Sequence, residues 1–214
     1  MSQSEKKAQP LEWNEYQKLL SRMDEKLFNW RKEEEPSIRT IQKIDRWTRY
    51  QTLFVAGTYF GLRAKEFLSL NWEKVVGKSE GDVLNVNQFK TKKSRLVYFN
   101  ATAIRYFDRN YSDIDPLNPH ELILPKISDP FTAVSTRQFN LELVRIFDDC
   151  KIKCLSPSSH TFRKTFATRL WEDSNQGQDV LIQIQEALGH EDFKDTMAYL
   201  GITEDRIRNN FLRL

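Results

Sequence analysis

The sequence predicts a mainly α-helical fold with a small antiparallel β-sheet. Most of the chain carries apolar residues at the steps of three and four that produce one apolar helix face, and only two neighbouring runs look like strands. The chain has 214 residues, 39% hydrophobic and 29% charged, so it can bury the core of a globular protein. No internal repeat or low-complexity linker divides it. We expect a single domain over residues 11–214 after a flexible tail over residues 1–10.

The first half of the chain should contain three helices. The first is expected over residues 11–30, where six apolar residues alternate in steps of three and four: Trp13, Tyr16, Leu20, Met23, Leu27 and Trp30. The second is expected over residues 41–60, with a second half so apolar that it should be deeply buried, and with a bend at Gly61. A short helix should follow within residues 62–75.

The runs DVLNVNQF and SRLVYF favour strands, and the basic turn KTKK between them indicates a hairpin. Helical spacing then returns several times, with a proline-rich loop over residues 115–130 and a polar loop over residues 172–180. The expected helices of this half are residues 101–112, 136–150, 159–175, 179–189 and 205–214.

Composition excludes several classes of protein. The two cysteines, Cys150 and Cys154, lack the additional ligands of a zinc site, so we expect reduced thiols and no metal centre. No dinucleotide, Walker, GxSxG or HExxH motif occurs, and no cofactor is indicated. The N-terminus does not resemble a signal peptide and no run is long enough to span a membrane, so we expect a cytoplasmic protein. The net charge of only +3 leaves a nucleic-acid partner open.

The stretch SHTFR places His160 and Arg163 one turn apart beside apolar anchors. A buried arginine needs an anionic partner, because its desolvation is otherwise too costly. No acidic residue follows within the same helix until Glu172. The partner should therefore come from elsewhere in the fold or from outside the protein.

Other polar residues have ordinary explanations when each is taken alone. Arg63 could pair with Glu66 on a solvated helix face, and Lys90 could belong to a charged hairpin tip. His190 could follow a helix C-cap at Gly189, and Tyr199 could be a core ring.

Their order along the chain is more specific. GLRxxE, a hairpin lysine, HxxR, LGH and a tyrosine nine residues after that histidine occur in one sequence. From about Leu11 to the C-terminus the chain resembles the catalytic domain of the tyrosine recombinase, or phage integrase, family, most closely in GLRAKEFLSLNW and ALGHEDFKDTMAYLGI. The resemblance implies a site-specific recombinase that cuts and rejoins DNA through a 3′-phosphotyrosine intermediate, without metal, ATP or cofactor.

The resemblance also implies the role of each motif residue. Tyr199 would be the nucleophile and His160 the base that activates it, since a phenol is almost fully protonated at neutral pH. Arg63 and Arg163 would grip the equatorial oxygens of the transition state, where planar guanidinium groups give paired hydrogen bonds. His190 would donate a further hydrogen bond to the phosphate.

Lys90, in the hairpin turn, would protonate the departing 5′-oxygen. The alignment favours it over Lys92 and Lys93, although Phe89 stands where many relatives carry glycine. Glu66 would orient Arg63 without taking part in the chemistry.

The partner implied is double-stranded DNA, bound through basic residues on its phosphates. A solvated surface is the ordinary alternative for these residues. They are Arg39, Lys43 and Arg46 on the second helix and Lys92, Lys93 and Arg95 in the hairpin.

The resemblance further implies a homotetramer on DNA, a cytoplasmic protein associated with the nucleoid, and accessory DNA-bending proteins as an option. A C-terminal helix at residues 205–214 could pack on its own protomer or on a neighbour, and a monomer in solution is compatible with either. No separate N-terminal DNA-binding domain is expected. The rival interpretations are a DNA-binding regulator that retains the fold and a helical interaction module; integration, excision, inversion and resolution all stay open as outcomes.

Overall fold

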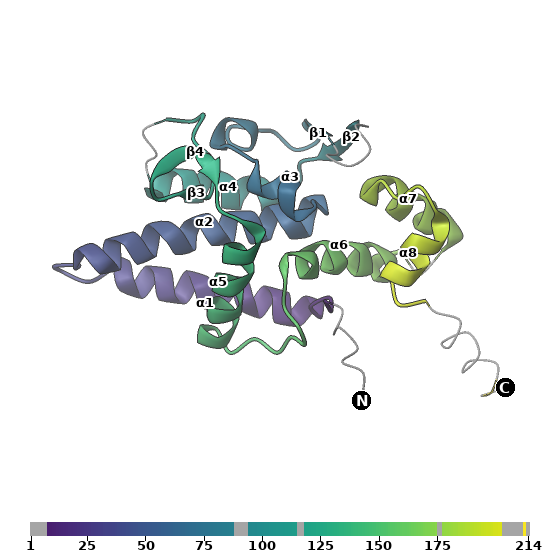
Figure 1. The fold of residues 1–214 in the computed structure, drawn as a ribbon, viewed down its shortest axis with the longest axis horizontal. Coiled ribbons are helices and arrows are strands. Elements are labelled where there is room, and N and C mark those ends of the chain that lie inside the picture. The colour runs from purple at the N-terminus through teal and green to yellow at the C-terminus, as the bar shows by residue number, and fades with distance from the viewer. Residues whose placement is uncertain (1–7, 88–93, 115–117, 175–176, 203–211, 213–214) are drawn as a thin grey trace.

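The computed structural model describes residues 8–87, 94–114, 118–174, 177–202 and 212. Within these ranges the fold is mainly helical, as the sequence predicts, and helices pack around one large apolar core (Figure 1). The helices are α1 (Trp13–Arg31), α2 (Ile38–Phe60), α3 (Ala64–Leu68), α4 (Ala101–Ile114), α5 (Thr136–Asp149), α6 (Ser159–Asp173), α7 (Gln178–Leu188) and α8 (Phe193–Tyr199).

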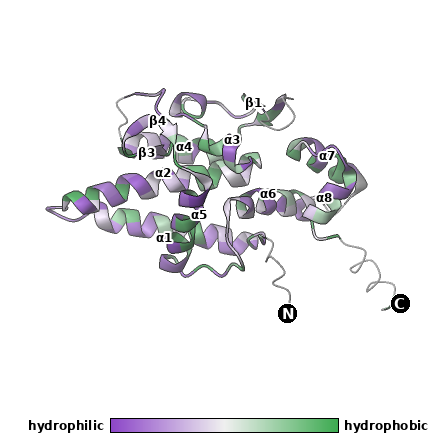
Figure 2. Ribbon diagram, in the orientation of Figure 1, coloured by the Kyte–Doolittle hydropathy of each residue, from purple (hydrophilic) through white to green (hydrophobic). Residues whose placement is uncertain are grey.

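Helices α1 and α2 lie side by side as a long pair (Figure 1). The apolar face predicted for α1 is confirmed, because Tyr16, Leu20, Met23 and Leu27 are buried. Hydrophobic and hydrophilic residues alternate along the helix (Figure 2). The N-terminal part of α2 is largely exposed. From Trp47 onwards nearly every residue is buried, because α2 then packs against α1, α4 and α6.

The predicted hairpin is present as strands β1 (Val83–Asn87) and β2 (Ser94–Tyr98), paired antiparallel. Their burial alternates, so one face covers the core and the other faces water. Strand β2 also contacts α7, which connects the hairpin to the C-terminal part of the chain.

Two features of the described residues differ from the sequence prediction. The described part of the proline-rich loop contains a second small hairpin, β3 (Pro125–Lys126) with β4 (Asp129–Ala133), so the described residues form two small sheets and not one. The sequence does not indicate this short pairing, because Pro119, Pro125 and Pro130 are unfavourable in strands. Helix α8 is an additional helix, since its residues enter the sequence prediction only as part of the motif ALGHEDFKDTMAYLGI. The helix expected at residues 205–214 lies outside the described residues apart from position 212.

Helices α6, α7 and α8 enclose a second, smaller apolar cluster. Its buried members are Ala167, Ile184 and Leu188, and Phe166 and Tyr199 pack against them. Cys150 is buried and Cys154 is partly buried, and both are free cysteines. Within the described ranges, no helix combines the length and apolar character needed to cross a membrane.

Candidate active site

Two helix C-termini converge at the centre of the candidate site. Helix α2 ends at Gly61 and α7 ends at Gly189, both in the left-handed conformation with φ of 57° and 58°. The last carbonyl groups of a helix have no donor within that helix, and they form the negative end of its dipole. At both helices these carbonyl groups accept hydrogen bonds from arginines.

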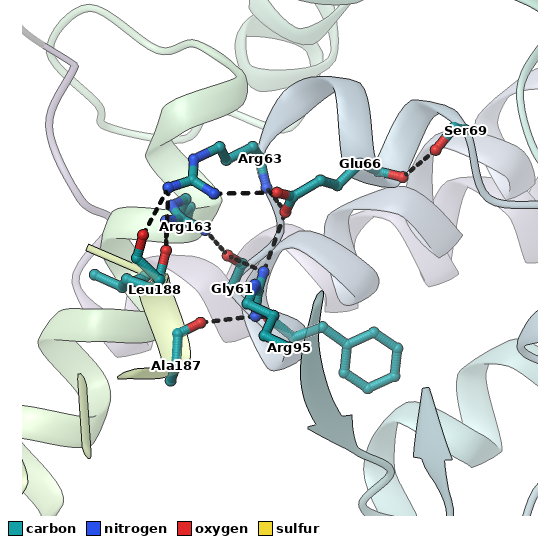
Figure 3. A network of polar contacts seen from close by, with 10 residues as sticks. Gly61, Arg63, Glu66, Ser69, Arg95, Arg163, Ala187 and Leu188 are labelled. Atoms are coloured by element: carbon teal, nitrogen blue, oxygen red, sulfur yellow. Dashed lines mark hydrogen bonds and ion pairs between the residues drawn. The ribbon is translucent and has the colours of Figure 1, made fainter. Parts of the chain in front are cut away.

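Three guanidinium groups and three acceptors alternate in a closed ring (Figure 3). Arg63 and Arg95 share the carboxylate of Glu66, at 3.2 Å from Arg63 Nη1 to Oε1 and 3.1 Å from Arg95 Nη2 to Oε2. Arg95 and Arg163 share the Gly61 carbonyl, and Arg163 and Arg63 share the Leu188 carbonyl. Every guanidinium group in the ring is thus fixed on two sides.

The ring carries an excess of positive charge. Three guanidinium groups face one carboxylate, which leaves a formal charge of +2, and the two helix ends offset roughly one unit of it. Burial opposes the ionisation of the Glu66 carboxyl, but the Arg63 backbone N–H and the charges of Arg95 and Arg163 outweigh it, and its pKa is lowered. The guanidinium ring is therefore suited to a further anion.

Arg163 lies on α6, as the sequence predicts, but its hydrogen-bond partners are not the anion that the sequence leads us to expect. Only 2% of the residue is exposed. Its partners are the carbonyl groups of Gly61 and Leu188. These neutral acceptors, together with the nearby charge of Glu66, offset the desolvation of the buried guanidinium without a direct ion pair. Burial lowers the pKa of its guanidinium to about 10, which still leaves it protonated at neutral pH.

Arg63 is more accessible, because 30% of its side chain is exposed. The Arg63 backbone N–H donates to Glu66 Oε2 at 2.8 Å, so Glu66 both caps α3 and holds the Arg63 guanidinium. A ligand arriving from solvent would meet Arg63 before Arg163.

Two histidines lie near the arginines. His160, at the start of α6, is exposed; partial desolvation of its ring and the positive charges of Arg163 and Lys164 lower its pKa. Burial and the charges of Arg163 and Arg63 lower the pKa of His190 to about 4. His190 is thus neutral at pH 7, and the shift of the His160 pKa favours its neutral form.

His190 is held by helix α8. Its Nδ1 lies 3.0 Å from the hydroxyl oxygen of buried Thr196. If this hydroxyl donates to Nδ1, the proton of the neutral imidazole sits on Nε2, which is then a hydrogen-bond donor. Thr196 was not anticipated, because a threonine inside a helix has no distinctive sequence signal.

Tyr199, the last residue of α8, packs its ring against His190 with 5.4 Å between ring centroids. Its hydroxyl is buried and has no hydrogen-bond partner within the described residues. Burial raises the pKa of this phenol to about 12; the charge of Arg163, the approach of its guanidinium to the hydroxyl and the charge of Arg63 oppose this shift, although no hydrogen bond of standard geometry joins the two side chains. The tyrosine therefore lies close to both arginines, in the protonated form.

The remaining predicted residues are the three hairpin lysines and the basic residues of α2. Lys90, Lys92 and Lys93 lie outside the described residues. Arg39 and Lys43 are exposed on the first half of α2, about 25 to 35 Å from Gly61 along the helix axis. Lys43 Nζ lies over the Trp30 ring at 4.2 Å.

Arg46, the third basic residue of that helix, lies over the Tyr50 ring at 5.5 Å. A role of these residues on DNA stays a prediction.

Arg95 is predicted from the sequence to contact DNA at the surface of the hairpin, but the structure places it in the interior. Only 7% of its side chain is exposed, and the guanidinium donates to Glu66, Phe60, Gly61 and Ala187. The alternation of β2 turns Arg95 to the core face, so proximity to the basic turn did not indicate its direction.

A mainly helical domain in which histidines and a tyrosine surround a cluster of arginines has the architecture of the tyrosine recombinases. Residues 9–206 match the Phage integrase family, and the chain belongs to this family. A curated relative, tyrosine recombinase XerC of Anoxybacillus flavithermus, is 45% identical over 58 residues, which are 27% of this chain and 18% of that protein.

Solved structures agree on the fold. A post-cleavage complex of the XerH site-specific recombinase with a palindromic difH substrate has a TM-score of 0.66 at 20% identity, over 98% of this chain and 54% of that chain. The lambda integrase catalytic core has a TM-score of 0.53 at 16% identity, over 86% of this chain and 93% of that one. The chain thus spans about half the length of XerH and most of the lambda integrase core.

Proposed function

We propose that residues 11–214 are the catalytic domain of a site-specific recombinase that cleaves and rejoins DNA through a 3′-phosphotyrosine intermediate. The observation that carries the proposal is the excess positive charge of the guanidinium ring, with a tyrosine and two histidines beside it. A phosphodiester supplies the missing negative charge, and guanidinium groups bind its oxygens in pairs.

In the proposed first step the Tyr199 oxygen attacks the phosphorus atom and its proton passes to His160. The bond from phosphorus to the 5′-oxygen breaks, and Lys90 gives that oxygen a proton. Arg63 and Arg163 stabilise the charge that develops on the two non-bridging oxygens, with a hydrogen bond from His190. The phosphotyrosine bond conserves the energy of the broken linkage, so a second 5′-hydroxyl can reverse the reaction.

This chemistry requires neither ATP nor a metal ion, because the energy is conserved in the covalent intermediate and the arginines supply positive charge. The buried Tyr199 hydroxyl must reach the phosphate first. The proposed attack therefore requires a shift of helix α8, which makes its main contacts with α7.

The proposed partner is double-stranded DNA in the nucleoid. XerH was solved on its difH substrate and lambda integrase was solved on DNA. By extension we propose that four copies of this chain assemble on two DNA sites, with accessory proteins as an option.

A covalent-adduct experiment tests the proposal. The binding site is first found by selection from random duplexes, and the protein is then incubated with a duplex of that sequence nicked beside the cleavage position. We expect a protein–DNA adduct that survives denaturation and disappears in Tyr199→Phe, while noncovalent binding persists. Tight binding without any adduct would instead identify a DNA-binding regulator.

A further inference from the structure

Arg95 is a buried charge for which the proposed chemistry has no use. It lies in β2, outside the motifs, and forms four hydrogen bonds to three other elements. Its Nη1 donates to the carbonyl oxygens of Ala187 at 2.7 Å and Phe60 at 3.4 Å, and its Nη2 donates to those of Gly61 at 3.2 Å and to Glu66 Oε2 at 3.1 Å. One side chain thus joins the hairpin to α2, α3 and α7.

The link between Arg95 and Arg63 is the Glu66 carboxylate, 99% buried and divided between them. Oε2 accepts from Arg95 and from the Arg63 backbone, and Oε1 accepts from the Arg63 guanidinium. Without Arg95, Glu66 would lose a charge partner and be free to turn towards Arg63 or Arg163. Either movement would withdraw a guanidinium group from the phosphate position.

The four acceptors of Arg95 require a guanidinium group. Nη1 donates to the Phe60 and Ala187 carbonyl groups, and Nη2 donates to the Gly61 carbonyl group and the Glu66 carboxylate. A lysine has one nitrogen and cannot span Ala187 and Glu66 together. The arrangement therefore demands more than a positive charge.

We infer that Arg95 is a positioning residue of the cleavage reaction, which fixes Glu66 and through it the two phosphate-binding arginines. The inference rests on the proposed function and adds to it a residue that does not touch DNA. It also gives a reason for a buried arginine on β2, because Arg95 joins this strand to the ring of arginines.

The test compares Arg95→Met, Arg95→Lys, Glu66→Gln and the double variant Arg95→Met/Glu66→Gln in the full chain, with Arg145→Met as the control because Arg145 lies on the surface. The measurements are the single-turnover rate of adduct formation on the selected nicked duplex, the Kd for that duplex, and the thermal unfolding midpoint. We expect Arg95→Met to slow adduct formation by about 10- to 100-fold, the usual effect of losing a group that orients a contact residue. The Kd should change by less than about threefold, since Arg95 makes no DNA contact.

Two results separate positioning from simple stabilisation. In the Glu66→Gln background, Arg95→Met should slow the reaction by much less than it does alone, because both changes break the same link. The cleavage rate of Arg95→Met should also decline at a higher pH than that of the wild type as the solution is acidified, because the lost positive charge raises the pKa of Glu66.

The outcomes are distinct. If the wild type is active and both Arg95→Lys and Arg95→Met cleave at the wild-type rate, the positioning role of Arg95 is wrong while the proposed function stands. If Arg95→Met does not fold, the cleavage rate of Arg95→Lys provides the test. Independent, multiplicative losses in the double variant would assign Arg95 a structural role only. A wild type that binds its site without forming an adduct overturns the proposed function, and the positioning role in cleavage with it.

Discussion

Arg63 and Arg163 donate hydrogen bonds to the same atom, the carbonyl oxygen of Leu188 at the end of α7. Two like charges would repel one another in a poorly solvated pocket. Shared acceptors hold them side by side before any substrate arrives, so little reorganisation is needed when a phosphate binds. Preorganised donors of this kind are the main source of electrostatic catalysis.

Arg163→Lys should lower the rate of adduct formation by about 30- to 1,000-fold, equivalent to about 2 to 4 kcal/mol of transition-state stabilisation. A lysine cannot hold Gly61 and Leu188 with two nitrogens and also present a fork to the phosphate. Single-turnover assays on the nicked duplex measure the effect, with the exposed Arg145→Lys as control. A rate within about threefold of the wild type would remove Arg163 from the mechanism.

Tyr199→Phe should abolish the adduct without reducing the stability of the protein. The change removes a buried hydroxyl that has no hydrogen-bond partner in the described structure, so the free energy of unfolding should stay equal or rise by about 1 kcal/mol. Urea unfolding measures this. The matched control Tyr98→Phe, at a 62% exposed position, should form the adduct normally. A marked loss of stability in Tyr199→Phe would show that the hydroxyl is satisfied in solution.

Gly61→Ala should destabilise the protein and slow cleavage together. An added Cβ would lie 2.5 Å from the Phe166 ring, and φ of 57° itself costs about 1 to 2 kcal/mol for alanine. Gly77→Ala is the matched control, because φ is 64° there and nothing lies within 4 Å of the added carbon. Equal losses of unfolding free energy in the two variants would contradict a close approach of α6 at Gly61.

Stability should fall as the pH decreases from about 6.5 towards 4. In this window the unfolded chain binds a proton at His190, whereas the folded chain, with a His190 pKa of about 4, does not. His190→Asn should reduce the loss of unfolding free energy between pH 7 and pH 5 by about 1 to 2 kcal/mol. The lower end of this range applies if solvent around the partly exposed ring weakens the shift of its pKa.

The part of the dependence due to His160 should persist in that variant. Urea unfolding at several pH values measures the slope, and His120→Asn, on the surface beside Glu73, is the control. An unchanged slope in His190→Asn would show that the folded imidazole titrates normally.

The general acid can be identified by changing the leaving group. Replacing the bridging 5′-oxygen with sulfur gives a thiolate that departs without a proton. We expect Lys90→Ala to cleave the oxygen substrate slowly and the sulfur substrate at the wild-type rate, whereas Lys92→Ala and Lys93→Ala should affect both substrates alike. Rescue in one of those two variants would move the role to that residue.

The sequence predicts the fold well where periodicity is strong. The faces of α1 and the burial of the second half of α2 follow from apolar spacing alone. The β3–β4 pairing is too short and too rich in proline for such a signal.

The motif residues of the site are also foreseeable, since GLRxxE and HxxR mark Arg63 and Arg163. The acceptors are not, because the Gly61, Leu188 and Gly189 carbonyl groups belong to the backbone and leave no trace in residue type. Arg95 was assigned to the wrong surface, because its direction depends on strand register and not on neighbouring charge.

The last turn of α7 serves all three arginines: Ala187 binds Arg95, Leu188 binds Arg63 and Arg163, and Gly189 binds Arg63. The tyrosine-bearing helix begins only a few residues later. Chimeric proteins that exchange C-terminal segments between relatives should therefore be spliced after residue 189. A junction placed before α7 would replace the segment whose carbonyl groups accept from the three arginines, and any change in the position of that segment would break these hydrogen bonds.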